Sequence, residues 1–328
     1  MLKVGVFGAG HLGKIHIRQW KEVQGAELVG FYDPDIDRSI AAEKEFGIKG
    51  FSNIGDLIVA TDALDIVSTT ITHYEIAKKC LLAGKHIFIE KPLAQSLEEA
   101  QELVQLVKEA NVKCQVGHVE RYNPAYLALE EQELQPMFIE AHRLAQFNPR
   151  GTDVSVILDL MIHDIDIVMH LVKSPVRRIS ASGVSVVSES ADIANARIEF
   201  DNGCVANLTS SRISLKNMRK MRLFQRDAYI GIDFLEKKTE VIQMKEEGYK
   251  GGMMDLPIQI PDGSQKTISV NMPEIKEGNA IRMELQEFAD AIANDTPVRV
   301  TVYDGYQAMD VAHQILRKMS LHNELHKV

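Results

Sequence analysis

The sequence predicts an α/β protein with a doubly wound parallel sheet at the N-terminus, followed by an α+β domain with a large, open, mostly antiparallel sheet. Short apolar runs alternate with amphipathic helical patterns over residues 1–120, and a Gly-x-Gly-x-x-Gly motif separates the first run from the first helix. Residues 121–328 contain many short alternating segments with turn signals between them, which is typical of strands joined by hairpins. We therefore expect two domains, 1–120 and 121–328.

The composition excludes several classes of protein. The chain has 328 residues, 45% hydrophobic and 25% charged, which is enough for two domains with sizeable cores. A net charge of −9 argues against nucleic acid or an anionic membrane as a partner. The three cysteines lie far apart without a Cys-x-x-Cys pair, so we expect neither a disulfide framework nor a zinc site. No apolar run approaches the about 20 residues that span a bilayer, and no signal peptide precedes the first strand, so we expect a cytoplasmic protein.

The glycine-rich turn follows an apolar strand, residues 4–7, and opens a helix. Its first glycine permits the tight turn, its second lets the backbone approach a pyrophosphate, and its third allows close helix–strand packing. The N-terminus of the helix offers free N–H groups to the anion. This context predicts a Rossmann-type dinucleotide site that includes Gly8, Gly10, His11, Leu12 and Gly13.

An acidic residue ends the second predicted strand, residues 26–32. Asp33 lies about 20 residues after the turn, where a carboxylate binds the ribose hydroxyls of NAD. The same carboxylate repels the 2′-phosphate of NADP, and Pro34 and Asp35 add no cation. We therefore expect NAD as the cofactor rather than NADP.

The alternation of strands and helices continues to residue 116. One buried strand, residues 86–90, delivers Glu90 and Lys91 to its carboxyl end, where open α/β sheets bind their ligands. Pro92 then stops the strand. The alternative is that Lys91 is one of 37 Lys and Arg residues, most of which are merely solvated.

A predicted helix over residues 154–172 is apolar around most of its circumference, so it should be mostly buried. Asp159, His163, Asp166 and His170 nevertheless recur at i, i+4, i+7 and i+11, which places them on one face. A polar stripe on a buried helix must be hydrogen-bonded or line a cleft. The alternatives are a locally satisfied Asp–His pair and a metal site, and we expect no metal because no third ligand is apparent.

The rest of the chain is rich in strands. Lys245–Asp255 carries three glycines and is expected to be a loop, and two helices over 281–294 and 303–321 close the chain. A large open sheet with helices on one face needs cover on the other, so we expect a homodimer or homotetramer. The predicted strands cover residues 137–144, 194–200, 204–210, 219–224, 228–234, 240–243, 256–260 and 266–270.

These motifs together resemble the Gfo/Idh/MocA family of NAD(P)-dependent oxidoreductases, through the glycine-rich turn, Asp33 and the segments 83–86 and 90–94. The resemblance implies that Lys91 lies beside the nicotinamide and the substrate, and that the Lys91–Pro92 peptide is cis. Ser68-Thr69-Thr70 replaces the Thr-Pro that is usual in the family, and Asp159-x-x-x-His163 matches a family motif. The further cofactor-binding residues that the resemblance implies are Ser68, Thr70, His73, Glu90 and Lys91.

The resemblance implies a dehydrogenase that acts on a sugar hydroxyl. In this interpretation His163 takes the hydroxyl proton as general base, Lys91 stabilises the developing charge on the oxygen, and Asp159 orients the pair. Two other classes remain open, a non-catalytic NAD-binding regulator on the same fold and a redox-neutral glycosidase that uses NAD transiently. Retention of all three residues argues against the regulator.

The substrate expectation rests on segments 117–124, 140–144 and 159–166, with Asp153. Within the family these are most similar to enzymes that oxidise C3 of UDP-N-acetylglucosamine for the amino sugars of lipid A or surface polysaccharides. An acidic protein that still places arginines in such segments fits a diphosphate, which arginine binds in bidentate fashion. Alternatively, some of these arginines pair with Glu120, Glu140 or Asp153. The alternative substrate is a free sugar or inositol. The candidate substrate-binding residues are Arg121, Tyr122, Asn123, His142, Arg143 and Arg150.

Overall fold

The computed structural model describes residues 1–148 and 154–325, which form two compact units. The first unit comprises Met1–Tyr122 together with Gly278–Asp310, and the second comprises Asn123–Glu277 with Val311–Val328. The sequence placed the first boundary close to this point. It wrongly assigned residues 278–310 to the second domain.

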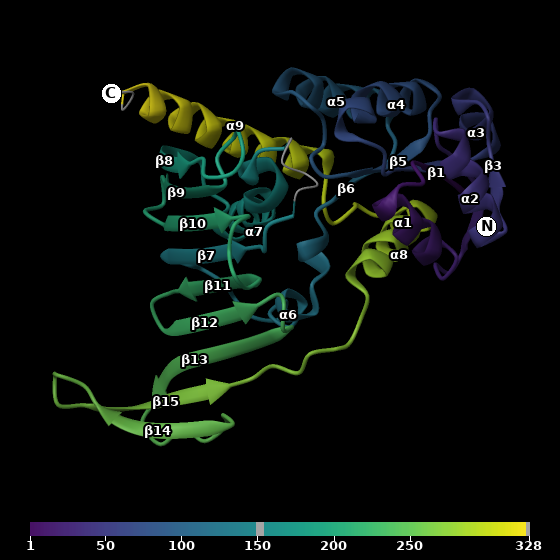
Figure 1. Cartoon of the computed structure of the whole chain (residues 1–328). Coiled ribbons are helices and arrows are strands. Elements are labelled where there is room, and N and C mark those ends of the chain that lie inside the picture. The colour runs from purple at the N-terminus through teal and green to yellow at the C-terminus, as the bar shows by residue number, and fades with distance from the viewer. Residues whose placement is uncertain (149–153, 326–328) are drawn as a thin grey trace. The chain divides into compact units, whose positions relative to one another are not determined.

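The first unit contains a parallel sheet with the strand order β3-β2-β1-β4-β5-β6 (Figure 1). The order reverses between β1 and β4, and such a switch point is where doubly wound sheets bind dinucleotides. The predicted doubly wound sheet is confirmed. Its strands are β1 Leu2–Phe7, β2 Ala26–Tyr32, β3 Lys49–Gly50, β4 Ala63–Ile66, β5 His86–Glu90 and β6 Cys114–Gly117. Its helical segments are α1 His11–Trp20, α2 Ile36–Phe46, α3 Ile54–Ala60, α4 Thr70–Leu82, α5 Leu97–Ala110, η1 Val119–Tyr122 and α8 Ala280–Ala293.

Local chemistry sets the helix ends in this unit. Ser96 and Glu99 form a reciprocal capping box at the start of α5, which satisfies N–H groups that the first turn of a helix leaves free. α8 joins the unit through its apolar face, because Leu285 and Phe288 pack into the same core as Trp20 and Phe88. This core joins Trp20 to Leu285 and Phe288, which lie about 265 residues further along the chain, and so distant a contact explains why the sequence misplaced α8.

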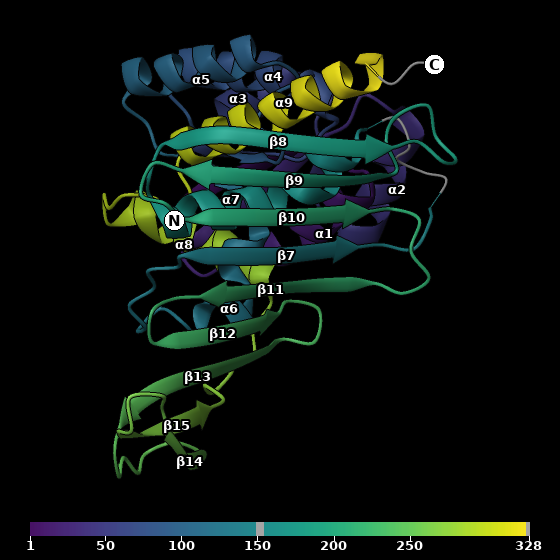
Figure 2. The same cartoon turned by 90° about the vertical axis from the view of Figure 1, so that its left-hand side faces the viewer.

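The second unit contains a sheet with the strand order β14-β15-β13-β12-β11-β7-β10-β9-β8 (Figure 2). Only β7 and β10 pair in parallel within the described part of this sheet, so the expected mostly antiparallel sheet is confirmed. The turn between β9 and β10 contains Asp201-Asn202-Gly203, with Gly203 at φ +87°, as the hairpin signal predicted. The strands are β7 Phe138–Leu144, β8 Val176–Val184, β9 Ile193–Phe200, β10 Val205–Ser211, β11 Met218–Phe224, β12 Ala228–Asp233, β13 Lys238–Glu246, β14 Met254–Gln259 and β15 Gln265–Asn271.

Two sequence expectations fail in this sheet. The sequence missed β8, an edge strand whose apolar alternation is broken by two arginines and by a register shift between Val176 and Arg178. The expected loop over residues 245–255 also carries the end of β13 and the start of β14, because cross-strand pairing with β15 extends both strands.

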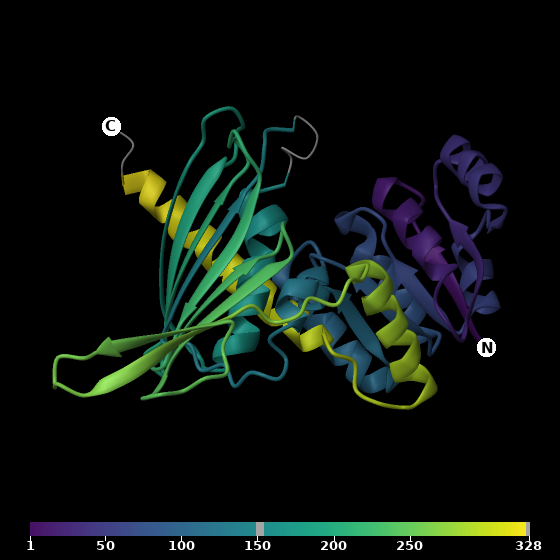
Figure 3. The ribbon, with the colours of Figure 1, turned by 90° about the horizontal axis from the view of Figure 1, so that it is seen from below.

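Helices cover one face of this sheet, and the other face is open (Figure 3). α6 Pro124–Leu127 contacts β12 and β13, while α7 Ile162–Val172 contacts β7 and β10. The alternation along β7 follows from this, since Ile139, Ala141 and Arg143 are buried whereas the residues between them are partly exposed. α9 Val302–Leu325 contributes residues to both units. Of the helices that the structure describes, none is long and apolar enough to cross a membrane.

Candidate active site

The glycine-rich turn between β1 and α1 has the geometry of a phosphate-binding turn. Gly8 adopts φ +103°, a conformation that side chains disfavour, and its N–H donates to the Tyr32 carbonyl at 2.8 Å. A Cβ atom on Gly13 would lie 2.1 Å from the Gly8 carbonyl oxygen, so only glycine fits there. Gly10 caps α1 without a side-chain hydrogen bond. The first N–H groups of α1 are therefore available to an anion, with His11 and Leu12 exposed beside them.

Asp33 follows β2 and is buried beside this turn. Its Oδ2 accepts the N–H of Ala9 at 2.7 Å, and its Oδ1 accepts the N–H of Asp35 at 2.9 Å. Arg38 on α2 places Nη1 3.4 Å from Asp33 Oδ2. Arg38 lies five residues after Asp33, beyond the two positions, Pro34 and Asp35, on which the expected absence of a cation rested. An arginine in the first turn of the following helix was the available signal, since such a residue can accept a 2′-phosphate.

His73 ties together the loops that follow β4 and β5. Its Nε2 lies 3.0 Å from the Ser68 carbonyl oxygen and its Nδ1 lies 3.0 Å from the Pro92 carbonyl oxygen. Burial lowers the pKa of His73, and the two carbonyl groups oppose that shift. The Ser68 hydroxyl pairs with Thr72 at 2.7 Å, while Thr70 is partly exposed at the start of α4. This bridge ties the backbone just after Lys91 to the loop that follows β4.

Glu90 and Lys91 end β5 at the same edge of the sheet. The Glu90 side chain is buried, and its Oε2 accepts the backbone N–H of Lys91 at 3.0 Å. The Lys91–Pro92 peptide is cis, which confirms that prediction. The first unit thus brings the glycine-rich turn, the loop after β4 and Lys91 to the carboxyl ends of neighbouring parallel strands, as the sequence predicted from their positions.

Arg121 and Tyr122 are packed inside the first unit. Arg121 is 2% exposed and lies 3.8 Å from Asp304, while the guanidinium of Arg299 lies 5.3 Å from the centre of the Tyr122 ring. Burial raises the pKa of Tyr122 far above its ordinary value. These contacts hold both side chains in place.

Asn123 begins the second unit and caps α6. Its Oδ1 accepts the N–H of Ala125 at 3.1 Å, and its side-chain amide donates to the Phe234 carbonyl at 3.0 Å. Pro124 occupies the first turn of α6, where its missing N–H leaves no helical hydrogen bond unmade.

Arg143 and His142 point to opposite faces of the sheet. Arg143 is buried on the helical face, where its Nε and Nη2 bind Asp164 of α7 at 3.1 and 2.8 Å. His142 lies on the open face, because successive strand residues alternate. Arg143 does pair with an acid, but the partner is Asp164 and not one of the acids expected from the sequence, and Glu140 pairs with Arg222.

The predicted polar helix begins at Ile157 and starts with a π-helical segment, η2 Ile157–Met161, before α7. The sequence predicted a regular α-helix here and gave no sign of the π turn. Asp159 and His163 are partly exposed, whereas Asp166 is buried and His170 stacks edge-on against Tyr126 at 6.3 Å. Arg150 and Asp153 lie outside the described residues.

A hollow of about 860 Å³ lies on the open face of the second sheet. His142 lines it, together with cross-strand ion pairs that include Lys220 and Asp233 at 3.2 Å. An aromatic cluster, which we define as Phe138, Phe224 and Tyr229, shares this face, with ring centres 5.9 and 5.3 Å apart. None of the residues assigned to proton transfer lines this hollow.

Comparison with known families agrees with this geometry. Residues 2–118 match the Gfo/Idh/MocA oxidoreductase family with its NAD-binding Rossmann fold, and residues 135–229 match the C-terminal domain of the same family. The UDP-N-acetylglucosamine 3-dehydrogenase of Acidithiobacillus ferrooxidans is 32% identical over 315 residues, which cover 96% of each chain. The chain belongs to the Gfo/Idh/MocA family. It is accordingly an oxidoreductase with a nicotinamide-dinucleotide-binding domain.

Other relatives and solved structures show the same architecture. The solved structure of the Acidithiobacillus ferrooxidans enzyme superposes with a TM-score of 0.86 over 97% of both chains at 30% identity. The scyllo-inositol 2-dehydrogenase (NAD(+)) of Bacillus subtilis is 28% identical and covers 94% of this chain and 92% of its own. The scyllo-inositol dehydrogenase of Lactobacillus casei, solved with NAD(H) and scyllo-inositol, shares the fold with a TM-score of 0.78 at 21% identity over 98% of both chains.

Proposed function

We propose that this protein is an NAD-dependent dehydrogenase that oxidises C3 of UDP-N-acetylglucosamine to the 3-keto sugar. The observation that carries the proposal is the 32% identity to a UDP-N-acetylglucosamine 3-dehydrogenase over 96% of both chains. Retention of Lys91, Asp159 and His163 supports turnover rather than a regulatory role. The product fits a route to 3-amino sugars of lipid A or surface polysaccharide.

The proposed chemistry assigns one role to each of three side chains. His163 takes the proton of the sugar hydroxyl, Lys91 donates a hydrogen bond to the same oxygen, and Asp159 orients the pair. The nicotinamide, when bound, supplies the hydride acceptor. The glycine-rich turn of α1 would hold the pyrophosphate of NAD, and Asp33 would hold the adenosine ribose.

The diphosphate of the substrate needs a cation that is not already neutralised. Arg143 is bound in bidentate fashion by Asp164, so we assign it to holding α7 against β7. Arg121, Tyr122 and Asn123 would shape the sugar-binding side, and Arg150 would bind the diphosphate. Arg150→Ala should weaken binding of UDP-N-acetylglucosamine more than binding of NAD. Arg177→Ala is the control, since Arg177 is exposed on β8.

A single-turnover experiment tests the function. Enzyme loaded with NAD is mixed with UDP-N-acetylglucosamine, and NADH is followed by its absorbance, with and without a trap for the keto product. NADH formation supports the proposal. If this substrate neither binds calorimetrically nor yields NADH, whereas myo-inositol or a simple hexose does, the protein is a free sugar or inositol dehydrogenase. The observation that supports this second candidate is the 28% identity to the scyllo-inositol 2-dehydrogenase (NAD(+)) of Bacillus subtilis.

We further propose that the open face of the second sheet pairs with a copy of itself. The aromatic cluster forms an apolar centre there, with cross-strand ion pairs around it, which is the anatomy of a protein interface. Phe224→Glu should produce a monomer by sedimentation at micromolar concentration. Val59→Glu on α3 is the control, because Val59 is exposed in the first unit. A monomeric wild-type protein would refute the assembly.

A further inference from the structure

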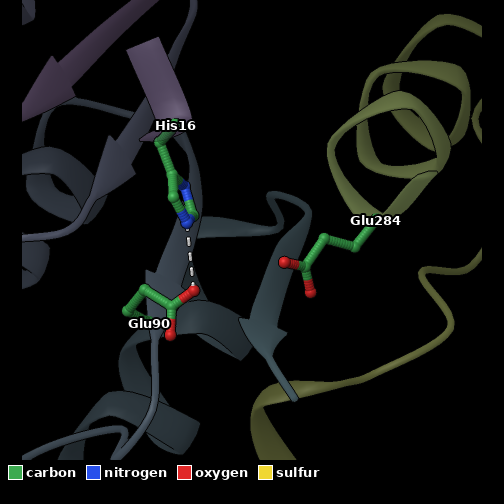
Figure 4. A group of neighbouring side chains, drawn as sticks. All are labelled: His16, Glu90 and Glu284. Carbon is green, nitrogen blue, oxygen red and sulfur yellow. Dashed lines mark ion pairs between the residues drawn. The ribbon is translucent and has the colours of Figure 1, made fainter. Parts of the chain in front are cut away.

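Four ionisable side chains meet inside the first unit, beneath the end of β5. They are His16 on α1, Asp65 on β4, Glu90 on β5 and Glu284 on α8, and their exposed fractions are 0%, 0%, 7% and 0%. Figure 4 shows His16 pointing at Glu90 while Glu284 extends from α8 toward them both. His16, Asp65 and Glu284 were not among the residues predicted from the sequence to be functional. Asp65 could have been noticed, because it is an acid within the otherwise apolar strand β4 and a buried acid needs a partner.

Contacts run without a break from α1 to the backbone of Lys91. Asp65 Oδ2 accepts the indole N–H of Trp20 at 2.7 Å and lies 2.9 Å from His16 Nδ1. His16 Nε2 lies 3.2 Å from Glu90 Oε1. The other oxygen of Glu90 accepts the N–H of Lys91 at 3.0 Å. One imidazole ring therefore joins two carboxyl groups, and the second of these holds the main chain of the lysine.

The two-sided contact decides the charge of His16. Nδ1 of His16 is hydrogen-bonded to Asp65, and Nε2 lies at ion-pair distance from Glu90, so each ring nitrogen faces a carboxylate and the arrangement favours a ring with two N–H groups. Burial alone lowers the pKa of His16, but Asp65 and Glu90 together raise it well above its ordinary value. Burial raises the pKa of Glu90, and the hydrogen bond from His16 and the charge of Lys91 bring it below its ordinary value. The ring is thus an imidazolium between two carboxylates.

Glu284 completes the charge balance. Its two oxygens have no hydrogen-bond partner among the described residues. Burial and the nearby Glu90 raise the pKa of Glu284 well above its ordinary value, which favours its protonated form. The ligand atoms of His16, Glu90 and Glu284 lie within 4.8 Å of one another.

We propose that His16 is a positioning residue of the dehydrogenase, which acts by holding Glu90 as a carboxylate so that Glu90 fixes the backbone of Lys91. The inference rests on the proposed role of Lys91 in the reaction. Without the imidazolium, Glu90 would be a buried charge lacking its main counterion, and it would take up a proton or turn away. The N–H of Lys91 would then lose its acceptor. Small displacements of a reacting group lower rates steeply, by about 100-fold for a misplacement of about 1 Å.

Three single variants and one double variant test this role. His16→Gln keeps a polar side chain but removes the charge, and Glu90→Gln removes the carboxylate. We expect each to lower kcat about tenfold or more, with KM for NAD changed less than about twofold, and the double variant to be no slower than the slower single variant. Trp20→Phe is the control, since Trp20 donates to Asp65 but does not touch Glu90, and it should keep kcat within about twofold. Losses that multiply in the double variant would overturn the proposal.

The pH profile separates positioning from simple packing. The charged and titratable groups that face Glu90 are His16, Lys91, Glu284 and, from α4, His73. His16 lowers the pKa of Glu90, so removing His16 raises the pKa of Glu90. If the reaction needs ionised Glu90, activity is then lost on acidification at a higher pH than in the wild-type protein. The acidic limb of kcat should move upward by about one pH unit in His16→Gln. A uniform loss of kcat at all pH values, with the limb unmoved, would show that His16 only packs.

A measurement without substrate keeps this inference distinct from the proposed function. Nitrogen-15 NMR of histidine-labelled protein, assigned by the loss of one signal in His16→Gln, reports both ring nitrogens of His16. We expect both to be protonated at pH 8, where an ordinary histidine is neutral. A neutral His16 at that pH overturns the inference even if the enzyme turns over the sugar. Absence of any turnover in the wild-type protein, with the imidazolium present, refutes the role of Lys91 instead.

Discussion

Two glycines in the nucleotide turn allow a paired test of how the turn works. A Cβ atom on Gly10 meets nothing within 4 Å, and Gly10 has φ −68°, so Gly10→Ala should fold normally. A Cβ atom on Gly13 would lie 2.1 Å from the Gly8 carbonyl oxygen and 2.7 Å from its carbon. Backbone atoms cannot turn aside as a flexible side chain does, so α1 and the turn must separate by more than about 1 Å to reach ordinary contact.

The two variants are expected to differ in whether they change the unfolding free energy as well as the affinity for NAD. Overpacking at Gly13 should cost about 1–3 kcal/mol of unfolding free energy and also weaken NAD binding, because the N-terminus of α1 moves with the turn. Gly10→Ala should change stability by less than about 0.5 kcal/mol. It should nevertheless weaken NAD binding at least about tenfold, or about 1.4 kcal/mol, because the added methyl group occupies the space of the pyrophosphate.

Urea unfolding and calorimetric titration with NAD measure these two effects separately. Wild-type NAD affinity in Gly10→Ala would show that no pyrophosphate approaches this backbone. Unchanged stability in Gly13→Ala would show that α1 does not pack against the turn as closely as the structure indicates. The NAD affinity of Gly10→Ala thus tests the approach of the pyrophosphate, and the stability of Gly13→Ala independently tests the packing of α1 against the turn.

Three further predictions concern the reaction, the cofactor and the second unit. Lys91→Ala and His163→Ala should each lower turnover about 100-fold or more while NAD binding stays largely intact in calorimetric titration; near-wild-type turnover of either variant would end that assignment. Wild-type protein should bind NAD at least about tenfold more tightly than NADP, and Arg38→Ala should widen the ratio by removing the cation beside the ribose; equal binding of the two cofactors would contradict this. Arg143→Met should lower the unfolding free energy by about 3–5 kcal/mol in urea, because the buried Asp164 loses its two-pronged contact with the guanidinium, whereas a double variant with Asp164→Leu should recover most of the loss.

The part of the site that depends on local backbone requirements was predictable from sequence. A tight turn needs glycine at a positive φ, a helix that touches a strand needs glycine at the contact, and a hairpin needs Asn-Gly at its tip. Gly8, Gly13 and Gly203 meet these needs within a few residues of chain, so spacing alone located them. Strand Ile87–Ile89 was predictable for a similar reason, because an entirely apolar run between polar residues reports burial on both faces.

Only the tertiary structure decided which buried charges meet. Asp164 partners Arg143 across a helix–sheet contact, and Glu284 reaches His16 and Glu90 from a helix that the sequence assigned to the other domain. The π turn before α7 was likewise not predicted from the sequence. The periodicity of apolar residues indicates which residues of one helix or strand are buried, and it depends on the sequence of that segment alone. The partner of a buried charge depends on the packing of segments far apart in the chain, and only the folded molecule specifies it.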